Sequence, residues 1–253
     1  MTITLLPALA AAFIIVLTRI GTMVMLLPGI GENTLPARIR LSLALLLTLI
    51  MLPGVRPLLP IDVNKPGSLV ALLGSEFIIG LMLGMTARFA FSALQVAGVA
   101  IAQQLGLAYA MTIDPGQGGQ AVVVSNFLTI LAMTLILVTD LHHLSLAAIY
   151  DSYRALPPGQ LPATGDMAEM LVRATASAFS IGVQIAAPIL VFSVVFNLGL
   201  GILSKLMPQI QVFFVAQPAA IILGVIILIG VLGVMMNVFL GSMERVLSTL
   251  LSG

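Results

Sequence analysis

Long apolar blocks separated by short polar breaks set the pattern of this chain. The apolar blocks run roughly over 3–30, 41–52, 69–113, 121–150, 168–204 and 209–243. The polar breaks are rich in proline, glycine and charge, as at 31–40, 53–66, 114–120 and 151–166. Because a membrane-spanning helix needs about 20 consecutive apolar residues, the blocks are candidates for membrane helices.

The lengths of these blocks do not match clean single spans. Block 41–52 is short for a span, whereas 69–113 would reach about 67 Å as one helix. Block 168–204 is also long, and Pro188 lies inside it. Such runs are typical of bent helices or helical hairpins kinked at glycine or proline. We therefore predict an all-α, multi-helix integral membrane protein of broken helices and helical hairpins, with a single domain over residues 1–253.

Composition supports the membrane class. The 253 residues are 60% hydrophobic and 8% charged, with a mean hydropathy of +1.20, whereas soluble proteins carry about 25% charged residues. The net charge of +1 argues against a nucleic-acid partner, which would favour a basic face. The chain has no cysteine, which excludes thiol chemistry. No Lys or Arg precedes Arg19, so we expect a retained first helix and not a cleaved signal peptide.

Three charged residues, Arg19, Glu76 and Arg88, lie inside the apolar blocks. A charge there is costly in lipid, so each must contact protein or water. Glu76 and Arg88 would stand about 18 Å apart along one helix, too far to pair. Two interpretations stay open: the charges cap helix ends or snorkel to the interface, or they face other subunits. The GxxxG pattern of Gly80 and Gly84 favours close helix packing in the same region.

The sequence carries no common enzyme signature, such as HExxH, GxSxG, the Walker motif or GxGxxG. Its two histidines, His142 and His143, are flanked by Asp140 and Asp151. Because adjacent helical residues point to different faces, we interpret them as a polar turn at an interface and not as a metal site. Asp114 is a candidate intramembrane acid, although Asp-Pro-Gly is more typical of a turn. We predict no catalytic, metal or cofactor site.

The segment GILSKLMPQIQVFFVAQPAAIILG, residues 201–224, forms a polar break between the last two blocks. If these blocks form a hairpin, Lys205–Gln217 is its tip. We expect the helix to break at Met207-Pro208, because proline cannot continue a helix interior and restricts the preceding residue. Candidate inter-subunit contacts at the tip are Lys205, Pro208, Gln209 and Gln211. The alternative is an ordinary interfacial turn, because polar turn residues need no function.

Four stretches carry a recognisable set of motifs. Residues 19–53 contain an arginine, a proline closing the first helix, a proline before a basic pair and a proline ending the second helix; these are Arg19, Pro28, Pro36 with Arg38 and Arg40, and Pro53. The others are a glycine-rich stretch closing on Asp-Pro, a His-to-Pro-x-Gly segment and FNLGLGILSKLMPQIQVFFVAQPAAIILG, at residues 76–115, 143–159 and 196–224. Together they resemble the FliR/SctT family of flagellar and injectisome type III export-gate proteins, over nearly the whole chain.

Two positions depart from the family pattern. Leu141 stands where the family has glycine before its His-containing turn. The run YAMTI at Tyr109–Ile113 lacks the phenylalanines that relatives often carry there, which weakens the expectation of an aromatic seal.

The resemblance implies a non-enzymatic subunit of a protein export gate in the bacterial inner membrane, at the flagellar basal body. Such a gate passes unfolded flagellar proteins and associates with FliP-like, FliQ-like and FlhB-like partners. The alternatives are an injectisome export-gate subunit and, less consistent with the sequence, a secondary transporter or solute channel. Transporters often contain two related halves, and we find no matching halves here.

The family's gate also has a plug-like loop at a matching position. The candidate plug residues here are Met111, Ile113, Asp114, Pro115, Gly116, Gln117, Gly118, Gly119 and Gln120. The glycines allow backbone angles that other residues avoid, and the Met and Ile side chains are suited to an apolar, dewetting constriction. A plain surface loop is the alternative.

Overall fold

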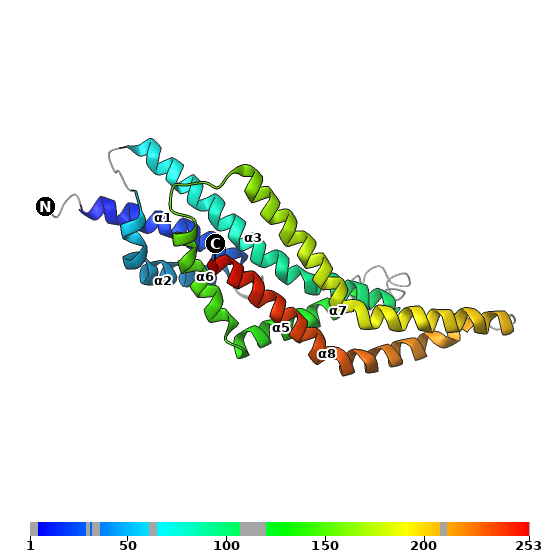
Figure 1. The fold of residues 1–253 in the computed structure, drawn as a ribbon. Coiled ribbons are helices and arrows are strands. Elements are labelled where there is room, and N and C mark those ends of the chain that lie inside the picture. The colour runs from blue at the N-terminus through cyan, green and yellow to red at the C-terminus, as the bar shows by residue number, and fades with distance from the viewer. Residues whose placement is uncertain are drawn as a thin grey trace. The chain divides into compact units, whose positions relative to one another are not determined.

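Every regular element in the described part of the chain is helical (Figure 1). The computed structural model describes residues 5–28, 31, 36–60, 65–106, 120–207 and 212–252. The elements are α1 (Leu5–Leu26), α2 (Ala37–Val55), the 3-10 helix η1 (Arg56–Leu58), α3 (Pro66–Gln104), α5 (Gln120–Val138), α6 (Leu141–Ala155), α7 (Thr164–Leu206) and α8 (Val212–Ser252). The prediction of an all-α protein is confirmed.

Among the described residues, five helices are long and apolar enough to cross a membrane. They are α1, α2 with η1, α3, α7 and α8, while α5 and α6 pass the same test jointly as a bent pair. The break between α5 and α6 contains Asp140, whose φ of 59° lies in the left-handed region. A right-handed helix cannot continue through that conformation. This bent pair is a broken helix of the predicted kind.

The helices α3, α7 and α8 contain 39, 43 and 41 residues. At about 1.5 Å per residue, each is about twice as long as the hydrocarbon core of a bilayer is thick. The expectation of a break inside the long blocks is wrong for the described part of 69–113, which stays helical to Gln104. Pro188 and Pro218 likewise lie inside α7 and α8. Neighbouring helices and local adjustments can satisfy the carbonyl that such a proline frees.

The chain divides into two compact units. Unit 1 contains Met1–Ala90, Ile136–Ala176 and Met243–Gly253, and unit 2 contains Phe91–Leu135 and Ser177–Ser242. Because α3, α5, α7 and α8 each contribute residues to both units, neither unit is one continuous stretch of chain. A single domain over residues 1–253 therefore stays a prediction.

The core of unit 1 forms around α1. Its buried positions Ala12, Val16, Ile20 and Met23 are spaced by three or four residues and therefore form one stripe along the helix. This stripe belongs to a cluster that also contains buried side chains of α2, α3 and α6, among them Leu47, Leu83 and Ile149.

The GxxxG pattern of α3 brings this helix close to α1 within unit 1. A Cβ atom added at Gly84 would lie 2.8 Å from the Cβ of Leu26, and one at Gly80 would lie 2.7 Å from the carbonyl oxygen of Arg19. Both distances are too short for a real side chain. The two glycines therefore allow an approach that larger residues would prevent, as in other small-xxx-small helix pairs.

In unit 2, glycines mark where the second part of α3 meets its neighbours. A Cβ atom at Gly98 would overlap the backbone of Ser125 in α5, and one at Gly182 of α7 would lie 2.9 Å from the carbonyl oxygen of Ala93. A Cβ atom at Gly224 of α8 would overlap the side chain of Leu105. Helices α5 and α7 thus contact this part of α3, and α8 contacts the residue that follows its end.

The last part of α7 and the first part of α8 lie side by side as a hairpin (Figure 1). A Cβ atom at Gly224 of α8 would lie 3.5 Å from the Phe192 ring of α7. Helix α7 ends at Leu206, next to the predicted break at Met207-Pro208. Helix α8 already begins at Val212, so Gln217 lies inside a helix, and the predicted tip extends too far in that direction.

Candidate functional site

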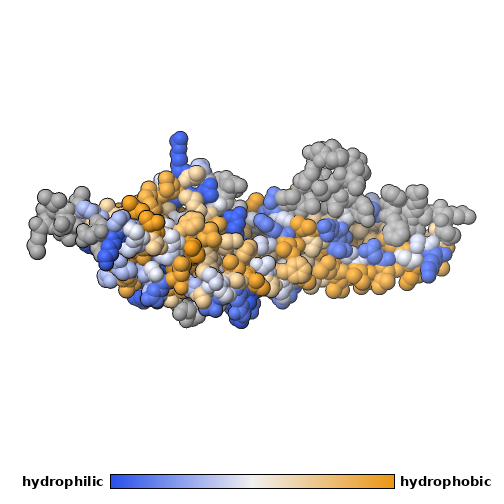
Figure 2. Space-filling view, turned by 90° about the horizontal axis from the view of Figure 1, so that it is seen from above, coloured by the Kyte–Doolittle hydropathy of each residue, from blue (hydrophilic) through white to orange (hydrophobic). Residues whose placement is uncertain are grey.

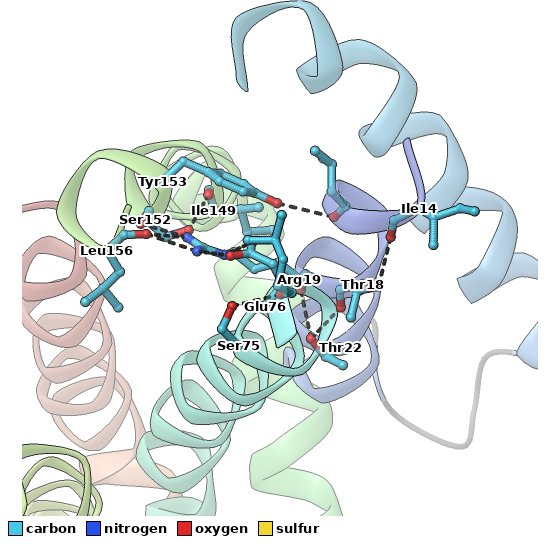
Figure 3. Close-up of polar contacts among 12 residues, drawn as sticks. Ile14, Thr18, Arg19, Thr22, Ser75, Glu76, Ile149, Ser152, Tyr153 and Leu156 are labelled. Carbon is cyan, nitrogen blue, oxygen red and sulfur yellow. Dashed lines mark hydrogen bonds and ion pairs between the residues drawn. The ribbon is translucent and has the colours of Figure 1, made fainter. Parts of the chain in front are cut away.

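A fully buried ion pair joins α1 to α3 inside unit 1 (Figure 3). The Nε of Arg19 donates to Oε2 of Glu76 at 2.7 Å, and Nη2 donates to Oε1 at 2.8 Å. Both side chains have an exposed fraction of 0%. This two-bond arrangement matches the planar guanidinium to the carboxylate and is among the stronger protein hydrogen-bond geometries.

The remaining donors of Arg19 are used by the end of α6. Nη1 donates to the carbonyl oxygens of Ser152 at 2.9 Å and Leu156 at 3.0 Å, and Nη2 also donates to Leu156 at 3.0 Å. The last carbonyls of a helix carry partial negative charge. That of Ser152 also accepts the backbone N–H of Leu156 at 2.9 Å. A guanidinium has five N–H donors, and these two carbonyls together with Glu76 accept five hydrogen bonds from it.

Tyr153 completes the enclosure of the guanidinium. Its ring centroid lies 4.2 Å from the Cζ of Arg19, a cation–π distance. Its hydroxyl donates to the carbonyl oxygen of Val16 at 3.2 Å, so the same side chain also binds the backbone of α1. Arg19 and Tyr153 therefore connect α1, α3 and α6 through polar contacts in an otherwise apolar core. We name Arg19, Glu76, Tyr153 and the Ser152 and Leu156 carbonyls the Arg19 cluster.

The local sequence explains how α1 and α3 approach closely enough for this pair. Gly80 lies one helical turn after Glu76, and an added Cβ there would overlap the Oγ1 of Thr22. Thr22 itself donates to the carbonyl oxygens of Thr18 and Arg19, at 2.8 and 2.9 Å. The hydroxyl thus needs no partner on α3, and the missing side chain at Gly80 leaves room for it.

Of the three predicted buried charges, two are buried in the structure and one is exposed. Arg19 and Glu76 are buried as predicted and contact each other. The interpretations that they snorkel to the interface or face other subunits are therefore both wrong for this pair. Arg88 is exposed, so its assignment as a buried charge is also wrong. It lies more than three helical turns after Glu76 on α3, on a part of the helix surface that the described residues of this chain do not cover.

The other predicted site residues are placed only in part. Lys205 is exposed in the last turn of α7. Pro208, Gln209 and Gln211 lie outside the described residues, as do the candidate plug residues Met111, Ile113, Asp114, Pro115, Gly116, Gln117, Gly118 and Gly119. Gln120 is the first residue of α5.

The structure brings the two histidines together with an aspartate. The His142 and His143 ring centroids are 4.1 Å apart, and the Nδ1 of His143 lies 3.5 Å from Oδ1 of Asp140. The argument that adjacent histidines must diverge is wrong here: both residues belong to α6, yet their rings lie close together.

Sequence reasoning missed two polar arrangements. Tyr153 was not singled out, although a tyrosine ring can bind a cation over its face. In unit 2, Ser193 donates to the side-chain oxygen of Gln104 at 2.6 Å, and Asn197 donates to the Ser193 hydroxyl at 3.1 Å. Gln104 is 89 positions away from Ser193, and nothing in the sequence pairs these uncharged residues.

Known proteins resemble this chain along most of its length. The family model described as "Bacterial export proteins, family 1" matches residues 10–246. The flagellar biosynthetic protein FliR of Caulobacter vibrioides is 43% identical over 214 residues, which cover 85% of each chain. FliR of Pectobacterium carotovorum is 34% identical, with 83% of this chain and 80% of the relative covered. FliR of Escherichia coli K12 is 29% identical, with 83% and 79% covered.

These relatives and the five apolar helices identify a membrane component of the flagellar export apparatus, in the bacterial inner membrane at the flagellar basal body. The resemblance seen in the sequence motifs is confirmed by a match that includes the Arg19 cluster and both units. The chain belongs to family 1 of the bacterial export proteins.

Proposed function

We propose that this chain is a subunit of the type III protein export gate and forms, with FliP-like and FliQ-like partners, the channel that passes unfolded flagellar proteins. An FlhB-like protein is a further partner in this proposal. The observation that carries it is the family match over residues 10–246, together with the flagellar names of the relatives. In this role the chain is a transport component without catalytic activity. The flagellar names favour a flagellar gate over an injectisome gate.

The surface of the α7–α8 hairpin supports a role inside a larger assembly. Apolar side chains occupy much of this end of the visible face (Figure 2). Side chains of the hairpin with an exposed fraction of at least 60% include Val191, Val194, Val195, Leu198, Ile202 and Leu206 on α7, and Val215, Ile222, Ile226 and Ile229 on α8. Apolar surface of this extent is normally covered by lipid or by another protein. Helices longer than a bilayer is thick favour partner proteins for part of it.

Co-expression tests the assembly part of the proposal. We expect the chain expressed alone to be unstable or aggregated after detergent extraction, because its apolar hairpin lacks partners. Co-expression with FliP-like and FliQ-like proteins should yield one monodisperse complex that contains this chain. Size-exclusion chromatography with light scattering measures both outcomes. A solitary chain that is folded and monodisperse, and that gains nothing from the partners, would contradict the export-gate role.

Exposed Lys205 is consistent with a contact at the hairpin tip. We propose that Lys205 and the neighbouring Pro208, Gln209 and Gln211 contact loops of adjacent subunits. The apolar helices on both sides leave this short polar segment as the part of the hairpin suited to hydrogen bonds outside lipid.

We also propose that residues 111–120 seal the idle channel. A pore for an unfolded chain would leak ions, each charge gaining about 2.3 kcal/mol per 100 mV as it crosses. Deletion of Gln117–Gln120, or Met111→Gly with Ile113→Gly, should leave the complex assembled but permeable. Ion influx into cells without export substrate measures the effect. The control is Gln160→Gly with Leu161→Gly, in the exposed connection before α7. An assembled loop variant that stays as tight as this control would exclude the loop from the seal.

A further inference from the structure

The turn between α5 and α6 gathers three side chains that are able to bind a metal ion. Asp140, His142 and His143 each offer a ligand atom, and these atoms all lie within 4.8 Å of one another. We propose that they form a binding site for a divalent transition-metal ion of the Zn²⁺ class. The site is independent of the proposed export function, because it rests only on the geometry of this turn in unit 1.

The backbone of the turn explains why the three side chains converge. In the middle of a helix, neighbouring residues point about 100° apart. Here Asp140 has a φ of 59° and precedes the first turn of α6, so its carboxylate turns back toward that helix. Asp140 occupies the N-cap position, where a carboxylate usually accepts a hydrogen bond from a backbone N–H. It makes no such side-chain bond. Its carboxylate instead lies 3.5 Å from Nδ1 of His143.

His142 supplies a second, independent observation. Its Nδ1 atom is buried and has no hydrogen-bond partner among the described residues. Most buried polar atoms in proteins do have a partner, so such a nitrogen needs an explanation. A metal ion beside the two imidazole rings would provide one, because imidazole nitrogen is a common ligand for transition metals.

The ligand set fits zinc-like ions. Zn²⁺ binds imidazole nitrogen and carboxylate oxygen at about 2.0–2.2 Å, which places the ligand atoms of a tetrahedral site about 3.3 Å apart. The separations of up to 4.8 Å between the ligand atoms would shorten to that value on binding. Three protein ligands leave the fourth position for water. Harder ions such as Mg²⁺ prefer oxygen ligands, so two imidazoles disfavour them.

Metal binding would fix the start of α6, whose other end contributes the Ser152 and Leu156 carbonyls to the Arg19 cluster. Both ends of this helix would then be held by a cation within unit 1. The consequence is local: the ion stabilises the first turn of α6 and its left-handed entry at Asp140.

Cobalt titration tests the site directly. The full chain, purified with its partners in detergent and carrying a tag without histidine, is stripped with EDTA and titrated with Co²⁺ at about pH 7.5, where imidazole is mostly neutral. Absorption bands of tetrahedral Co²⁺ report the site, and Zn²⁺ should displace them. The test variants are Asp140→Asn, which tolerates the left-handed backbone, and His143→Asn. Asp166→Asn, an acid in the first turn of α7, is the matched control.

We expect one Co²⁺ per chain for the wild type and for Asp166→Asn. Asp140→Asn and His143→Asn should weaken binding by about tenfold or more, since even removal of an outer-sphere partner costs about 10–100-fold. Circular dichroism should show unchanged helix content in both variants. A wild-type chain that binds neither Co²⁺ nor Zn²⁺, or folded variants that bind as tightly as the wild type, would overturn the proposal.

Discussion

Replacement of Arg19 by leucine is expected to prevent the chain from entering the export complex. The substitution leaves Glu76 buried without its cation, and the Ser152 and Leu156 carbonyls lose the hydrogen bonds from the guanidinium. Removing one partner of a buried ion pair costs about 3–5 kcal/mol. That is a large share of the about 5–15 kcal/mol by which a typical protein is stable. The amount of this chain in the detergent-extracted complex, with motility of the cells, measures the effect.

Two further variants test whether the effect comes from the unpaired buried charge of Glu76 and is specific to the Arg19 cluster. Arg19→Leu combined with Glu76→Leu removes both charges, and replacing a buried pair by apolar residues is often nearly neutral. The double variant should therefore assemble better than Arg19→Leu alone. Arg88→Leu removes an exposed arginine of α3, the helix that also carries Glu76, and this variant should assemble normally. If Arg19→Leu assembles and exports as well as Arg88→Leu, the Arg19 cluster does not hold unit 1 together.

The second large effect is expected at Gly98, in unit 2. A Cβ atom there would lie 2.6 Å from the backbone nitrogen of Ser125 and would also overlap its Cα. Because the obstacle is backbone, α3 and α5 must move apart to admit even an alanine. Overpacking of this kind costs about 1–3 kcal/mol. Gly98→Ala should therefore lower the midpoint of thermal unfolding of the co-purified complex.

The matched control is Gly230→Ala in α8. An added Cβ at Gly230 has nothing within 4 Å, and alanine is favoured over glycine in a helix by about 1 kcal/mol. Its unfolding midpoint should equal or exceed that of the wild type. If Gly98→Ala unfolds at the same temperature as Gly230→Ala, then α3 and α5 do not pack as closely as the structure shows.

Composition and block pattern were sufficient to predict the class of this protein. So few charges cannot cover a soluble surface, and apolar blocks of this length indicate helices in a membrane. The positions of helix ends were less predictable. Pro208 suggested the end of α7 correctly, whereas Pro188 and Pro218 proved compatible with continuous helices. Proline alone does not decide between these outcomes, because neighbouring helices can compensate for its missing hydrogen bond.

The partners of the buried charges could not be read from the sequence. Arg19 and Glu76 are 57 positions apart, and the carbonyls that share the guanidinium come from a third helix. Only the tertiary packing of α1, α3 and α6 brings them together. Burial itself could not be read from the sequence either. Arg88 lies in sequence that is equally apolar, yet its side chain is exposed.

The turn at Asp140 shows why a rule for ideal helices failed. The rule that adjacent histidines diverge considers only the directions in which helical residues leave the backbone, whereas the two imidazole rings of α6 lie close together. The left-handed Asp140, at the N-cap before this helix, adds a carboxylate 3.5 Å from Nδ1 of His143. The sequence Asp-Leu-His-His does not predict a left-handed backbone at the aspartate, because aspartate adopts that conformation only occasionally.

Photo-crosslinking to a flagellar protein arrested in transit tests the export-gate role most directly. A fused domain that cannot unfold holds the exported protein in the channel, and a photo-reactive amino acid replaces Met111 or, as a control, exposed Leu161. We predict an adduct between this chain and the arrested protein from position 111 and none from position 161, with the adduct absent when no exported protein is present. If scanning residues 107–120 and α7 gives no adduct, while other gate subunits cross-link to the same arrested protein, this chain does not line the export channel.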